Sequence, residues 1–150
     1  MEHLARSPTY ELWLEILERP FLFRSPFLGD DFVVMLIAND TSITPDEQFA
    51  LSLQIVEQGC RYAVCYGYEC STWDDSIGMA FLSTDPNYNP SDDRFVMTTW
   101  HKNEPLEDVV SWFRWLTSFA DFTPKYFLVL LVGYSPAIES EIRQTLIGYF

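Results

Sequence analysis

The chain has 150 residues, of which 48% are hydrophobic and 17% aromatic, and this composition excludes a disordered chain and suffices for one hydrophobic core. Nine Lys and Arg residues stand against 22 Asp and Glu residues, so the formal net charge is −13. Because binding to nucleic acid or to an anionic membrane depends on basic side chains, this charge disfavours both as direct partners.

The length and the cysteines predict a single domain in a reducing compartment. A chain this short is expected to form one domain over residues 1–150. It shows no signal segment and no apolar run near the roughly 20 residues that span a bilayer. Cys60, Cys65 and Cys70 are odd in number and lack the CxxC spacing of zinc or redox motifs. A cytoplasmic protein is therefore expected.

The first elements are predicted to be a helix and a connector. Ser7-Pro8 is typical of a helix start, and the apolar residues at 12, 13, 16 and 17 would then share one helical face. This helix would end before Pro20. Residues 20–29 include two prolines and three phenylalanines, so we expect an irregular apolar connector or a short edge strand there.

Four short apolar runs alternate with helical patterns in the rest of the chain. Thr44-Pro45-Asp46-Glu47 is a capping box that predicts a helix start. The polar stretch 83–93 predicts the longest exposed loop. The helices are expected over 44–59, from Ser71 or Thr72, over about 105–120 and from Ser135-Pro136. The strands are expected at Phe32–Ala38, Tyr62–Tyr66, Phe95–Thr99 and Tyr126–Val132.

Alternating strands and helices predict an α/β fold. Strands joined by helices run parallel, and the helices cover both faces of their sheet. We therefore expect a Rossmann-like three-layer sandwich with a mostly parallel sheet of about four strands. Residues 1–31 would form the helix and connector, and residues 32–150 the repeating strand–helix units.

Polar side chains from distant parts of the chain follow the predicted strands. The carboxyl ends of parallel strands meet at one edge of the sheet, where α/β proteins place their chemistry. Carboxylates and a histidine at this edge suit general acid–base catalysis or a Mg²⁺ or Mn²⁺ site. The candidate catalytic residues are Asp40, Glu69 and His101, and the candidate metal ligands are Asp40, Asp74, Asp75 and His101.

Structural roles also explain several of these residues. Asp74 and Asp75 at a helix start would interact favourably with the helix dipole, and His101 beside Trp100 is typical of a surface histidine stacked on its neighbour. The chain has no GxGxxG, GxxxxGK[ST] or GxSxG motif, which disfavours a nucleotide cofactor and a serine nucleophile. A divalent metal is implied only if the protein is an enzyme.

Two functions of different classes fit the sequence. The first is a small acidic interaction module, such as an inhibitor or immunity-type protein, that binds a basic protein partner. The second is a metal-dependent hydrolase, or a ligand-sensing domain without catalysis, that uses the carboxyl-end edge of the sheet. Trp112 and Trp115 fit the helical core as well as a contact surface. The candidate contacts of the first function are Tyr88, Asp92, Asp93, Trp100, Trp112 and Trp115.

Overall fold

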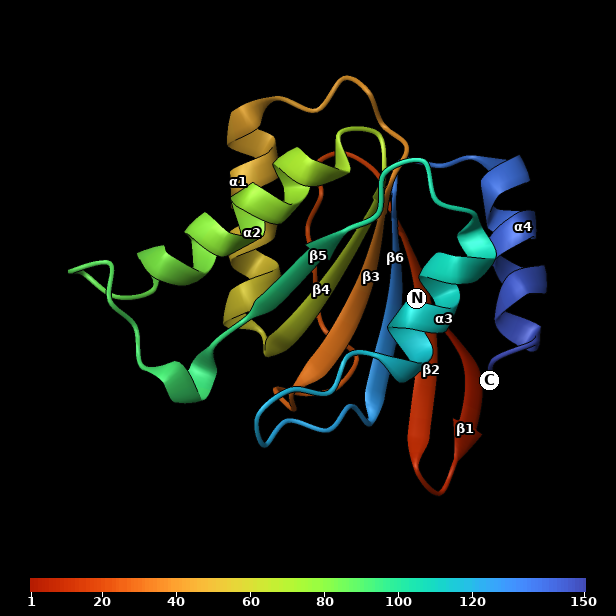
Figure 1. Ribbon diagram of the computed structural model, residues 1–150. Helices are drawn as coiled ribbons and strands as arrows, with labels where there is room; N and C mark the ends of the chain where they lie inside the picture. Colours follow the sequence, from red (N-terminus) through yellow and green to blue (C-terminus); the bar gives the residue numbers. More distant parts are fainter.

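A single sheet of six strands, in the order β1-β2-β6-β3-β4-β5, runs through the molecule (Figure 1). The computed structural model describes residues 1–150. β1 pairs with β2 in antiparallel fashion, and all other neighbours are parallel. The sheet therefore has more strands than expected and is mostly parallel, as predicted. The strands are β1 (Glu2–Ser7), β2 (Tyr10–Leu17), β3 (Phe32–Ala38), β4 (Cys60–Gly67), β5 (Met97–Trp100) and β6 (Tyr126–Val132).

Helices cover both faces of this sheet, which confirms the expected three-layer α/β arrangement. α1 and α2 lie on one face and α3 and α4 on the other (Figure 1). One apolar cluster fills the space under α1 and α2, and a second fills the space under α3 and α4. No helix combines the length and the apolar character needed to cross a membrane. The helices are α1 (Pro45–Glu57), α2 (Cys70–Ser83), α3 (Leu106–Trp115) and α4 (Pro136–Ile147).

The predicted N-terminal helix is wrong, because the first 17 residues form a β-hairpin. Pro8 and Thr9 make its turn, since Ser7 pairs with Tyr10. β2 is buried on both faces: Leu12 and Leu14 pack toward α3 and α4, and Leu17 packs on the opposite side. A strand that is buried on both faces can have apolar residues at the same sequence spacing as the apolar stripe of a helix. The spacing of apolar residues alone therefore does not distinguish the two.

Residues 20–29 form the irregular apolar connector that was predicted. Phe21, Phe23 and Phe27 are buried against the cluster under α1. Two glutamines of α1 hold its backbone: the Phe23 amide donates to Gln54 Oε1 at 2.8 Å, and Gln58 Nε2 donates to the Phe23 carbonyl at 2.8 Å. The connector thus covers part of the sheet in place of a helix.

Most other predicted elements are confirmed, with shifts that have local causes. β3 and β6 have the predicted bounds, and Thr44 and Glu47 form both bonds of the capping box. β5 starts at Met97 because the preceding residues 92–94 form a 3₁₀ turn. α3 ends at Trp115, before the predicted position, where the Thr117 hydroxyl donates to the Phe113 carbonyl and competes with further helical bonds.

The chain changes direction between β3 and β6. From β3 it continues to β4 and β5 through α1 and α2, and it then crosses back to β6 through α3 on the opposite face. In parallel α/β sheets the crevice at such a switch point is the usual ligand site. The carboxyl ends of β3 and β6 are therefore the first place to look for chemistry.

Candidate functional site

Hydrogen bonds of the chain itself bridge the carboxyl ends of β3 and β6 at the switch point. The amides of Asn39 and Asp40 both donate to the Val132 carbonyl, at 2.8 and 3.0 Å. Asn39 Nδ2 also donates to the Gly133 carbonyl at 3.3 Å. Gly133 has a φ of +92°, a conformation that favours glycine, and packs directly on Asp40. These contacts join the two strand ends directly, and a small cavity of about 300 Å³ lies beside them, lined by Asn39, Asp40 and Gly133 together with Glu18, Arg19 and Tyr134.

Asp40, a candidate catalytic residue, acts here as a structural acceptor. Its Oδ1 accepts bonds from the Ser42 hydroxyl and amide, at 2.6 and 2.8 Å. These bonds, followed by the charge of Arg19, lower the pKa of Asp40. Arg19 also donates to Glu47, so the ion pairs tie the connector to the start of α1. Because these partners stabilise the ionised form, Asp40 is a weaker base than an ordinary carboxylate.

A cavity of about 660 Å³ lies beside the switch point, at the carboxyl ends of β3 and β4. It brings together two of the three predicted catalytic residues, Glu69 and His101, with Asn39 and Tyr66. Asp40 lines a separate cavity with Arg19. The expected acid–base set is therefore divided between two places.

His101 is only 4% exposed, and both of its ring nitrogens are occupied. Nε2 is hydrogen-bonded to Thr99 Oγ1 at 3.0 Å, and Nδ1 to Glu104 Oε2 at 3.1 Å. The ring packs edge-on against Trp112, so the expected surface stack on Trp100 is wrong. This hydroxyl–imidazole–carboxylate order resembles a nucleophile with its base. Thr99, however, does not line the cavity, and the bonds fix the loop that follows β5.

The four candidate metal ligands do not meet. No three His, Cys, Asp or Glu side chains in the structure are grouped so that they could hold a metal ion. α2 begins at Cys70 with Glu69 as its N-cap, one residue earlier than the first predicted start. Asp74 and Asp75 therefore lie in the second turn and not at the helix start. Asp75 is exposed, whereas Asp74 is buried against β5.

The three cysteines are free and buried. Burial raises the pKa of Cys60 to about 12, and it raises the pKa of Cys65 well above that of an ordinary thiol. A thiol reacts as its thiolate, so these two side chains serve as small core residues. This agrees with the position of Cys65 in the middle of a strand.

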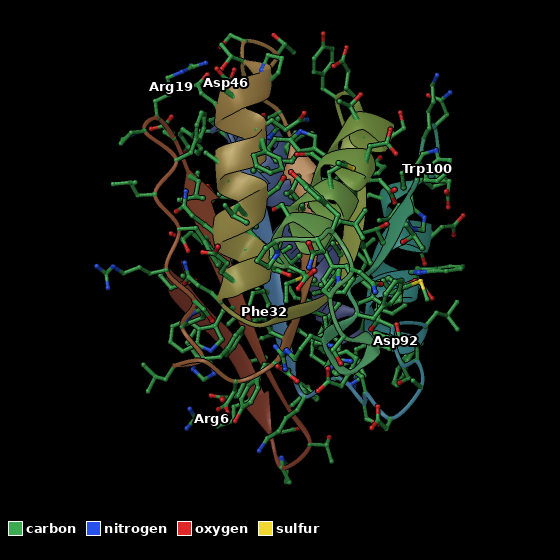
Figure 2. All side chains as sticks on the ribbon, turned by 90° about the vertical axis from the view of Figure 1, so that its left-hand side faces the viewer. Arg6, Arg19, Phe32, Asp46, Asp92 and Trp100 are labelled. Atoms are coloured by element: carbon green, nitrogen blue, oxygen red, sulfur yellow. The ribbon has the colours of Figure 1, made fainter.

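A second surface lies along the free edge of β5, which pairs only with β4. Trp100 is 54% exposed, and Phe95 is also exposed before the strand begins. α2 runs beside this edge and adds exposed Leu82 and Asp75. Figure 2 shows Trp100 and Asp92 on the same side of the molecule. We call this region the β5 edge surface, defined by Asp74, Asp75, Leu82, Phe95, Thr98 and Trp100.

The predicted contact residues are divided between two layers. Tyr88, Asp92 and Asp93 are exposed in the segment between α2 and β5. Asp93 lines a cavity with Arg61 and Lys125. Trp112 and Trp115 belong to α3, on the opposite face of the sheet. Trp112 is partly buried and donates through Nε1 to the Tyr62 hydroxyl at 3.1 Å, so it is a packing residue.

The sequence interpretation missed Leu82, Phe95 and Glu104. The apolar pattern predicts Phe95 as the first residue of a strand, whereas the structure places it before β5, after the acidic pair at 92 and 93. Leu82 follows Asp75 by seven residues, which places both on one side of a helix. Glu104 lies three residues after His101, a spacing compatible with the bond that the structure shows.

The family model described as "Domain of unknown function (DUF7684)" matches residues 9–147. The chain therefore belongs to this family. No curated protein and no solved structure matches it.

Proposed function

We propose that this member of the family is an acidic protein-interaction module that binds a basic protein through the β5 edge surface. The observation that carries the proposal is the combination of an unpaired strand edge with an exposed tryptophan and unpaired carboxylates. Each part has a binding role: the edge offers backbone groups, the tryptophan offers an apolar anchor, and the carboxylates attract cations.

The distribution of charge supports a basic partner. Most arginines are used inside the molecule: those at 6, 19, 61, 94 and 143 form ion pairs with carboxylates. Arg114 lies among aromatic rings. In contrast, Asp75, Asp92 and Asp93 take part in no ion pair. The negative charge left on the β5 side is available to a partner.

Trp100 is the proposed anchor. Buried tryptophans often dominate the energy of an interface, and carboxylates at its rim set the rate and the salt dependence of association. Trp100 points to the α2 side of the sheet, because it pairs with Cys65, which packs in the cluster under that helix. Asp75 on α2 is on the same side, so an apolar contact and a charged contact occur together.

The experiment compares binding of basic and acidic probes. Labelled peptides of alternating Lys and Val, and matched peptides of Glu and Val, are titrated with the protein and followed by fluorescence anisotropy. We expect binding of the basic peptides only, weakened by raising the salt from about 0.05 M to 0.3 M. Trp100→Ala should raise Kd by about tenfold or more, and Asp75→Asn should raise it by a smaller factor, because Asp75 is an exposed carboxylate of the same surface.

Trp115→Ala is the matched control, because Trp115 is 60% exposed but lies on the opposite face. Its Kd should equal that of the unaltered protein. Equal losses in Trp100→Ala and Trp115→Ala would contradict the proposed surface, and the absence of binding to any basic probe would contradict the proposed function.

A second candidate is the binding of a small ligand in the cavity at the carboxyl ends of β3 and β4. One observation favours it: Glu69 and His101 line this cavity at the edge where Rossmann-like sheets bind their ligands. The test is a screen of small polar metabolites by thermal unfolding, repeated with Glu69→Gln. A midpoint that rises with one compound, and rises less in the variant, would favour this function.

A further inference from the structure

The backbone of β5 presents unpaired groups to solvent at two defined residues. The His101 amide donates to the Cys65 carbonyl at 3.0 Å. The backbone groups of Met97 and Thr99, which alternate with it along the chain, therefore also face β4. Successive residues of a strand point their backbone groups to opposite sides. The amide and carbonyl groups of Thr98 and Trp100 therefore point away from the sheet.

The two edges of the sheet are protected to different degrees, since β5 is protected only by its length of four residues. β1 is interrupted by a bulge between His3 and Ala5, and its charged residues Glu2 and Arg6 are held in ion pairs. Bulges and charged residues are the usual devices that prevent a strand edge from pairing. β5 has the sequence Met-Thr-Thr-Trp, without a charge, a proline or a register shift.

Asp74 provides an unpartnered buried acceptor at this edge. Its side chain is 9% exposed, and Oδ2 has no hydrogen-bond partner. Burial raises the pKa of Asp74, and a hydrogen bond from the Thr98 side chain offsets part of this rise. An unpaired acceptor is expensive to bury, and a cationic donor would satisfy it. Because Thr98 belongs to the last strand, such a donor can approach from outside the sheet.

Open space lies beside Asp74 on the same side of α2. Gly78 follows Asp74 by four residues and Leu82 follows by another four, so the three share one helical stripe. A Cβ atom added at Gly78 would meet nothing within 4 Å. The space beside Gly78 on this stripe of α2 is therefore open.

We propose that an extended segment of the basic partner adds to β5 as a seventh strand and places a Lys or Arg side chain opposite Thr98, where it reaches Asp74. The inference rests on the proposed function and specifies its mode of binding. The residue two positions along the added strand would point to the same face and meet Trp100. A second copy of this chain is disfavoured as the occupant, because two molecules that each carry a net charge of −13 repel one another.

Backbone methylation of the probe peptide tests the strand pairing directly. Two versions of a Lys–Val peptide of about eight residues are compared. One carries N-methyl groups on the amides of its odd-numbered residues, and the other carries them on the amides of its even-numbered residues. In an added strand, only every second amide points toward β5 and donates to it. We expect one version to lose binding by at least about tenfold and the other to bind as the unmethylated peptide does.

A double-mutant cycle tests the contact with Asp74. Asp74→Asn should raise Kd about tenfold for a peptide with Lys at the contacting position and leave Kd unchanged for the peptide with norleucine there. Gly78→Leu should block both peptides, because it fills the open space beside position 78 of α2. Gly78→Ala is its matched control, and thermal unfolding of each variant verifies that the fold is retained.

The outcomes separate this inference from the proposed function. Equal affinity for both methylated peptides would overturn strand addition, and so would an equal loss of affinity for the Lys and norleucine peptides in Asp74→Asn. Neither result would contradict the binding of a basic partner. No binding of any basic peptide would overturn both. Sedimentation that shows a dimer dissociated by Gly78→Leu would assign the edge to a second copy and also overturn the inference.

Discussion

Gly133 lies against Asp40 so closely that a Cβ atom at position 133 would stand 2.7 Å from the Asp40 amide nitrogen. The two residues follow β6 and β3, the strands between which a parallel α/β sheet usually opens its ligand crevice. Their contact fills the centre of that crevice with backbone and leaves a small cavity of about 300 Å³ beside it. The residues at the switch point therefore pack tightly against one another, and we propose binding at the β5 edge instead.

Gly133→Ala is expected to lower the free energy of unfolding by about 2–4 kcal/mol, because a positive φ and a backbone clash act together. Urea denaturation followed by circular dichroism measures the loss. Gly29→Ala is the control: Gly29 also has a positive φ, of +90°, but its added Cβ would meet nothing within 4 Å. The control should lose about 1 kcal/mol, and equal losses would contradict the clash.

His101→Ala is expected to reduce stability by about 2–4 kcal/mol, since it removes two hydrogen bonds and leaves a cavity beside Trp112. Thermal unfolding with millimolar Mg²⁺, Mn²⁺ or Zn²⁺ should show no saturable rise in Tm that this substitution abolishes, because the candidate ligands do not meet. Such a rise would revive the metal-dependent hydrolase. Binding of basic peptides should be unaffected by the substitution.

Glu15→Gln is expected to stabilise the protein at neutral pH. Burial raises the pKa of Glu15, and its Oε2 has no hydrogen-bond partner. A raised native pKa means that ionisation opposes folding: the penalty is absent below the unfolded pKa of about 4.3 and complete above the native pKa. The gain should therefore be about 1 kcal/mol at pH 7 and vanish near pH 3.

Glu47→Gln is expected to change stability with pH in the direction opposite to Glu15→Gln. The hydrogen bond from Arg19 lowers the pKa of Glu47, so ionisation of this group favours folding. The substitution should reduce stability at pH 7, and the loss should diminish as the pH falls through the native pKa. Urea denaturation of both variants at several pH values distinguishes the two cases, and parallel pH profiles would contradict the assignment.

Arg114→Lys is expected to lower stability by about 1 kcal/mol. The Arg114 guanidinium lies 4.1 Å from the Trp115 ring centroid and 4.7 Å from that of Tyr10, and Nε donates to the Tyr149 carbonyl at 3.1 Å. Lysine cannot stack a planar group on these rings. Arg24→Lys on the exposed connector is the control and should change stability by less than about 0.5 kcal/mol in urea denaturation.

The sequence predicts the elements whose signals are local. The capping box at Thr44 and the apolar runs of β3 and β6 are confirmed because each depends on neighbouring residues or on burial of a whole strand. The hairpin was missed because burial of β2 on both faces depends on pairing with β6, more than a hundred residues away.

The candidate site was predictable only in part, for the same reason. Strand ends place Glu69 and His101 near one cavity, as expected. The packing of Gly133 on Asp40 and the ion pair between Arg19 and Asp40 are contacts between distant segments. No local sequence pattern predicts such contacts. The exposure of Trp100 follows from the position of β5 at the end of the strand order, which cannot be read from one sequence.

The bulge in β1 also bears on stoichiometry. A sheet that can be extended at both ends is a template for open-ended assembly, since each added strand exposes a new edge to the next molecule. Here the bulge and the ion pairs of Glu2 and Arg6 protect one end, which disfavours a repeating series of copies joined edge to edge. Under the proposed strand addition, the sheet would therefore be extended at the β5 end only, with the β1 end left as it is.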